Sequence, residues 1–137
     1  MEDSTILDLI YELKKKCIQR DEDFFNSHDI SQAEYNMFIC LKNCKNFNSY
    51  SVAEKMHLSL SRVSRIIDKM VNKELLTRST NKQDRRAIDI KMTSKGKEVM
   101  DKITEYRNNR EEMLKSKISL KEKEEISISI NKLIEIL

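Results

Sequence analysis

Short hydroxyl side chains alternate with arginines near the middle of this 137-residue chain. The polar side chains are Ser61, Arg62, Ser64 and Arg65, and Lys69 follows one helical turn later. Arginine donates paired hydrogen bonds to a guanine edge or a phosphate, and serine bonds to several base edges. The pattern therefore indicates a surface that binds nucleic acid. A solvated charged face on an ordinary helix has the same composition and is the alternative.

The same stretch has the period of an amphipathic helix. Its apolar residues recur at i, i+3, i+4 and i+7: Val63, Ile66, Ile67 and Met70. Ser59 is placed to cap the helix. The sequence thus predicts a helix whose inner face packs in a core and whose outer face carries the hydroxyls and arginines. Leu60 fits neither face: it contacts a thymine methyl group or tucks against the protein.

Charge is concentrated around this helix. Residues 54–95 hold eleven Lys or Arg against five Asp or Glu, a balance of +6, whereas the remainder has a balance of −3. One basic block on a slightly acidic body is typical of nucleic-acid binding. There is no apolar run long enough to cross a bilayer, and the acidic N-terminus is unlike a secretory signal. Three cysteines without a disulfide pattern favour a reduced, cytoplasmic protein.

The preceding residues predict helices that position this one. An apolar stripe runs through residues 4–25, and the capping box Ser31 to Glu34 opens a second helix. A further capping box, Ser51 to Glu54, opens a short helix that ends near residue 56. Two short helices separated by a tight turn indicate a helix-turn-helix.

The following residues predict a wing and two more helices. Residues 75–80 and 87–92 resemble strands, and the basic segment 81–86 forms the tip between them. Arginines at such a tip favour the minor groove. Helices over residues 94–116 and, after a capping box at Ser119, to the end of the chain follow. The last helix and the first have wider apolar faces than one small domain buries, which suits a second copy of the chain.

These motifs together resemble the MarR family of bacterial winged-helix transcription regulators. The resemblance covers nearly the whole chain and is strongest over residues 51–97. It is carried by AEKMHLSLSRVSRIIDKM at residues 53–70, KELLTR at 73–78, DRRA at 84–87 and MTSKG at 92–96. The order and the spacing of these segments both match the family pattern.

The resemblance implies a mainly α fold with a small β-hairpin wing. It gives a single domain over residues 1–137, with a winged helix-turn-helix DNA-binding lobe at 31–95 flanked by dimerisation helices at 1–26 and 96–137. It implies a homodimer bound to a pseudo-palindromic double-stranded DNA operator, more often as a repressor, and controlled by a small-molecule effector. The family's effector cavity lies between the dimer helices and the lobe, where Tyr35, Phe38 and Tyr106 either approach a ligand or pack in the core.

Site roles follow by position from the resemblance. The major groove is expected to face Ser61, Arg62, Ser64 and Arg65. Arg86 is the wing arginine, and Asp84 either orients it or caps the turn. DNA phosphates are expected to be bound by Lys82, Arg85 and Lys69. The chain departs from the family at His57 and Glu74, where glycine is common. One alternative is that these residues adopt the positive φ that favours glycine. The other, which we expect, is that the backbone here differs slightly from that of the family.

Cysteine chemistry gives an alternative reading. Cys17 follows three lysines, which favour a reactive thiolate and a redox-sensing regulator, but it also falls on the apolar stripe, where packing explains it. Cys40 and Cys44 lie one helical turn apart as a possible metal clip, yet the two histidines of the chain do not complete it. We expect neither a metal nor a cofactor.

Enzymatic function is not expected. The only glycine is Gly96, so there is no glycine-rich phosphate loop, and neither histidine lies in a nucleophile or general-base motif. Two non-enzymatic rivals remain: an architectural DNA-binding protein without an effector, and a protein–protein adaptor of the same fold that does not bind DNA.

Overall fold

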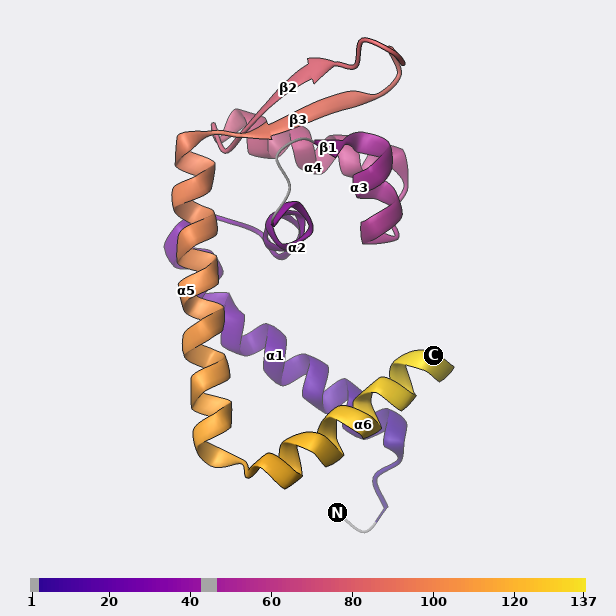
Figure 1. Cartoon of the computed structure of the whole chain (residues 1–137), viewed down its shortest axis with the longest axis vertical. Coiled ribbons are helices and arrows are strands. Elements are labelled where there is room, and N and C mark those ends of the chain that lie inside the picture. The colour runs from indigo at the N-terminus through magenta and orange to yellow at the C-terminus, as the bar shows by residue number, and fades with distance from the viewer. Residues whose placement is uncertain (1–2, 43–46) are drawn as a thin grey trace. The chain divides into compact units, whose positions relative to one another are not determined.

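The computed structural model describes residues 3–42 and 47–137 (Figure 1). Its elements are α1 (Ile6–His28), α2 (Gln32–Leu41), β1 (Phe47–Asn48), α3 (Ser49–Met56), α4 (Leu60–Asn72), β2 (Leu76–Thr80), β3 (Ile88–Met92), α5 (Ser94–Lys117) and α6 (Leu120–Ile136). They divide into two compact units, Met1–Met100 and Asp101–Leu137. The predicted fold, mainly α with a hairpin wing, is confirmed. Among the described residues, no helix has both the length and the apolar character to cross a membrane.

The core of the first unit lies among α2, α3, α4 and the sheet, which contact one another. The side chains without measurable exposure include Met37 and Phe38 of α2, Val52 of α3, and Val63, Ile67 and Met70 of α4. Ile66 is also buried, so the predicted inner stripe of α4 is confirmed. Phe38 belongs to this core, and Tyr35 is buried with its ring centroid 5.2 Å from that of Phe25 in α1.

The predicted helix starts at Ser31, Ser59 and Ser119 are confirmed, and the predicted start at Ser51 is wrong. Ser31 caps α2 in a full capping box with Glu34, and Ser59 caps α4 by accepting from the N–H of Arg62 at 3.2 Å. However, α3 begins at Ser49 and not after Ser51. Its cap is Asn48, whose side-chain oxygen accepts from the N–H of Ser51 at 2.8 Å. Asparagine caps a helix as effectively as serine does. The Ser-x-x-Glu pattern at Ser51, three residues after the true cap, therefore misled the prediction.

The wing belongs to a three-stranded antiparallel sheet in the order β1–β3–β2. Strands β2 and β3 were predicted, whereas β1 was missed. Strand β1 has only two residues, and its register pairs Phe47 with Ile90 and Asn48 with Asp89. The buried Ser49 hydroxyl accepts from the N–H of Ile88 at 3.1 Å, which ties the start of α3 to the wing.

Three non-glycine residues adopt a left-handed backbone: Asp29, His57 and Glu74, with φ of 50°, 54° and 62°. The expectation that the backbone at His57 and Glu74 departs from the family's was wrong. Both keep the conformation that glycine adopts without strain. Asp29 ends α1, which runs to His28, three residues beyond the predicted end.

Gly96 lies where no side chain fits. A β-carbon there would be 2.7 Å from Cγ of Met92 and closer still to the carbonyl oxygen of Leu75. The Thr93 hydroxyl accepts from the N–H of Gly96 at 2.9 Å and caps the start of α5. The single glycine of the sequence therefore allows α5 to begin directly against the corner between α4 and β2.

The second unit holds most of α5 and all of α6. Ser119 caps α6 by accepting from the N–H of Glu122 at 3.1 Å. None of the residues of α6 is buried in the single chain. Its apolar side chains stay exposed, among them Ile126, Ile128, Ile130, Ile134 and Ile136.

Candidate nucleic-acid interface

The outer face of α4 carries the residues that the sequence assigned to DNA. The side chains of Ser61, Arg62, Arg65 and Lys69 are exposed, and Ser64 is half-buried. Because the opposite face is fixed in the core by Val63 and Ile67, the helix cannot rotate these polar groups inward without losing that burial. The four residues expected to contact bases, together with Lys69, thus lie on the outer side of α4.

The cations of this surface lie apart from the acidic side chains that the structure describes. Within the described part of the chain, no carboxylate lies within ion-pairing distance of Arg62, Arg65 or Lys69. The same holds for Lys82 and Arg85 at the wing tip. Exposed cations without partners keep their hydrogen-bond donors available for phosphate oxygens and base edges.

The wing tip is ordered by two side chains that bond to the backbone. The carboxamide oxygen of Asn81 accepts from the N–H groups of Gln83 and Asp84 at 2.8 and 2.9 Å. Asp84 in turn accepts from the N–H of Arg86 at 3.0 Å, and its Oδ1 lies 3.5 Å from Nε of the same arginine. Asp84 therefore both caps the turn and faces the Arg86 side chain, so the two readings of Asp84 are compatible.

Two supporting residues escaped the sequence reasoning. Asn81 also donates to Asp89 at 2.9 Å, which ties the tip to β3. Asparagine at the start of a turn is a recognisable Asx-turn signal that could have identified it. Arg78 of β2 forms an ion pair with Asp68 of α4, which links the wing to that helix. That pair joins residues ten positions apart, and no local pattern signals it.

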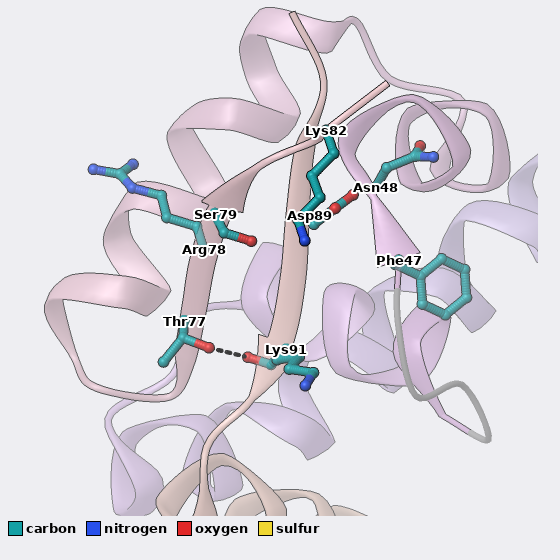
Figure 2. A pocket seen from close by; sticks show the side chains of 8 residues that line it. All are labelled: Phe47, Asn48, Thr77, Arg78, Ser79, Lys82, Asp89 and Lys91. Carbon is teal, nitrogen blue, oxygen red and sulfur yellow. Dashed lines mark hydrogen bonds between the residues drawn. The ribbon is translucent and has the colours of Figure 1, made fainter. Parts of the chain in front are cut away.

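A hollow of about 610 Å³ lies on the wing sheet (Figure 2). It is lined by Phe47, Asn48, Thr77, Arg78, Ser79, Lys82, Asp89 and Lys91. In Figure 2 the Lys82 side chain lies over the sheet beside Asp89, while the Arg78 guanidinium points away from the hollow. Neither Lys82 nor Lys91 forms an ion pair within the described residues. The two lysines therefore extend the basic surface from the wing tip onto the sheet.

The cysteines offer no assembled site in the part of the chain that is described. Cys17 is exposed on α1, so packing in the core of its own chain does not explain it. Cys40 is half-buried, and Cys44 lies outside the described residues. No group of three or more His, Cys, Asp or Glu that could hold a metal occurs in residues 3–42 and 47–137.

The geometry above is that of a winged helix-turn-helix protein, and comparisons agree. Residues 30–88 match the MarR family. The HTH-type transcriptional regulator SarZ of Staphylococcus aureus is 21% identical over 97 residues, which cover 71% of this chain and 66% of SarZ, just under two thirds of that protein.

Solved structures show the same fold. The S. aureus MepR–DNA complex superposes with a TM-score of 0.83 at 18% identity, over 97% of this chain and 98% of MepR. Streptococcus pneumoniae FabT in complex with DNA gives 0.81 at 17% identity, over 93% and 91%. Residues 30–88 are therefore similar to the MarR family, and the chain has the winged-helix fold of these two DNA-bound structures.

Proposed function

We propose that this protein is a sequence-specific, double-stranded DNA-binding transcription regulator that acts in the cytoplasm as a homodimeric repressor. The observation that carries the proposal is a set of exposed cations, Arg62, Arg65 and Lys69 on α4 and Lys82 and Arg85 on the wing tip, that form no ion pair within the described residues. The related SarZ is a transcriptional regulator by name, and the related MepR and FabT structures contain DNA.

Each side chain has a proposed role. Ser61, Arg62, Ser64 and Arg65 read base edges in the major groove, where an α-helix fits. Arg86 enters the minor groove, oriented by Asp84. Lys69, Lys82 and Arg85 hold phosphates, which fixes the register of the protein without reading sequence.

Dimerisation is proposed from two exposed apolar faces. In α1, Ile6, Leu9 and Leu13 are 66%, 51% and 56% exposed, and in α6, Ile134 is 67% exposed. Single apolar side chains on a surface are ordinary, but continuous faces on two helices mark a contact with another protein. A second copy satisfies both faces, and a two-fold dimer matches a pseudo-palindromic operator.

Control by a small-molecule effector is proposed on the family resemblance. A hollow of about 370 Å³ between α2 and α3, lined by Asn36, Ile39, Cys40, Lys55, Met56 and Leu58, offers apolar walls and one cation. Tyr35 and Phe38 are core residues, so core packing explains them. An architectural protein of the same fold would bind DNA without any such response.

Selection of duplexes from a random DNA library tests the proposal. A regulator enriches a sequence with two related half-sites about one helical turn apart. An adaptor that does not bind DNA enriches nothing at low salt, and an architectural protein binds without a preferred sequence. Either result contradicts the proposal. Failure of every tested ligand to release the selected duplex favours the effector-free regulator.

A further inference from the structure

A long-range polar contact holds the C-terminal end of α4. The ammonium of Lys73, the residue that caps α4, donates to the carbonyl oxygen of Asp29 at 2.7 Å and to Oε1 of Glu34 at 3.0 Å. Asp29 ends α1 and Glu34 lies in the first turn of α2. One side chain thus ties the end of α4 to the corner between α1 and α2.

Glu34 is unusual among the acidic residues. It is 2% exposed, and its Oε2 has no hydrogen-bond partner among the described residues. The other oxygen, Oε1, accepts from Lys73 and, at a longer 3.4 Å, from the N–H of Ser31. A buried carboxylate depends strongly on its cation, because leaving it unpaired is unfavourable. The pair is therefore stable only when α4 stays in this position.

The residues at the end of α4 also accept hydrogen bonds from the start of α5 and from the residue before it. The ammonium of Lys95 donates to the carbonyl oxygen of Lys73 at 3.0 Å, and the hydroxyl of Thr93 donates to that of Glu74 at 2.6 Å. The end of α4 is thus bonded both to the α1–α2 corner and to the start of α5. Arg65 lies eight residues before Lys73, about 12 Å along the helix, so a tilt of about 5° at the corner moves it roughly 1 Å.

We propose that Lys73, through Glu34 and Asp29, is a positioning residue that sets the orientation on DNA of α4, the helix proposed to enter the major groove. This inference rests on the proposed function. Hydrogen bonds to base edges depend on distances and angles that a shift of about 1 Å disrupts, whereas phosphate contacts tolerate it. Loss of the contact therefore reduces discrimination between sequences more than it reduces binding to DNA in general.

The test compares the double variant Glu34→Gln/Lys73→Met with the wild type. It removes one positive and one negative charge, so the net charge is unchanged and no buried carboxylate is left unpaired. The matched control is Glu112→Gln/Lys115→Met, which removes an exposed pair of 3.3 Å within α5. Affinities are measured for the duplex that the wild type selects and for a scrambled duplex of the same composition.

We expect the specific-to-scrambled affinity ratio to fall at least tenfold in the double variant, while affinity for the scrambled duplex changes less than threefold. The control keeps both values, and Lys73→Arg, which retains the donors, keeps most of the ratio. A folded double variant with a ratio within twofold of wild type overturns the inference. If the double variant does not fold, Glu34→Gln alone decides: a drop of about threefold supports the positioning role, and an unchanged ratio overturns it. A wild type that selects no sequence contradicts the proposed function instead.

Discussion

Asp84 engages Arg86 twice, through the backbone N–H at 3.0 Å and through Nε at 3.5 Å. The Arg86 side chain is 84% exposed, so apart from this contact it extends into solvent. The backbone and Nε of Arg86 are thus held by Asp84, while its terminal guanidinium nitrogens remain available. This arrangement suits binding in a narrow minor groove.

Arg86→Ala is expected to weaken DNA binding across all sequences while leaving the dimer intact, because the arginine contacts the minor groove, whose base pattern is degenerate. The side chain takes no part in the core, so the variant remains a dimer. Fluorescence anisotropy with selected and scrambled duplexes measures the first effect, and sedimentation measures the second. Dissociation into monomers would show that the wing is misplaced. Exposed Lys97 on α5 supplies the control, Lys97→Ala.

Arg65→Ala is expected to lose about 1–3 kcal/mol of operator binding with a relaxed base preference, if its guanidinium forms a paired contact with a base. Arg65→Lys is the sharper variant because it keeps the charge and loses the planar fork. It should retain affinity for scrambled DNA and lose discrimination. Equal losses on both duplexes would assign Arg65 to a phosphate.

Ile130→Asp is expected to shift the dimer toward monomers, because it puts a charge in the middle of the apolar face of α6. Asn131→Asp introduces the same charge beside that face and serves as the matched control. Analytical ultracentrifugation over a concentration series measures the effect. A dimer that survives Ile130→Asp unchanged would exclude this face from the interface.

His57→Gly and Glu74→Gly are each expected to stabilise the fold by about 0.5–1 kcal/mol, because glycine adopts positive φ without the strain of a β-carbon. Glu54→Gly, within α3, should destabilise by about 1 kcal/mol and controls for added flexibility. Urea unfolding at one fixed protein concentration gives the values. A loss of stability in both φ-positive variants would contradict the left-handed conformations.

Local patterns in the sequence predicted much of the fold and failed where neighbours distant in sequence decide the outcome. The inner face of α4 and the Ser31 and Ser59 caps follow from spacing within one helix. Strand β1 has only two residues and exists because β3 pairs with it, so no pattern of its own reveals it. The resemblance supplied the expected site roles at α4 and the wing.

The remainder of the site depends on tertiary contacts. The predictions did not include the contact between Lys73 and Glu34, which are 39 residues apart, because charge pairs of this kind form only after the helices pack. Glu34 was identified only as half of a capping box, and its burial was not apparent. Likewise, Arg78 was read as part of a strand, with no indication that it pairs with Asp68.

The most direct test of the central claim is the affinity of the wild-type protein for the promoter duplex beside its own gene, measured from about 50 to about 200 mM salt. Each neutralised phosphate contributes roughly −0.9 to the slope of log affinity against log salt. Three phosphate-binding cations in each protomer, Lys69, Lys82 and Arg85, predict a slope of roughly −5 for the dimer. Saturable binding with such a slope supports the account. Absence of saturable binding at the lowest salt would contradict it.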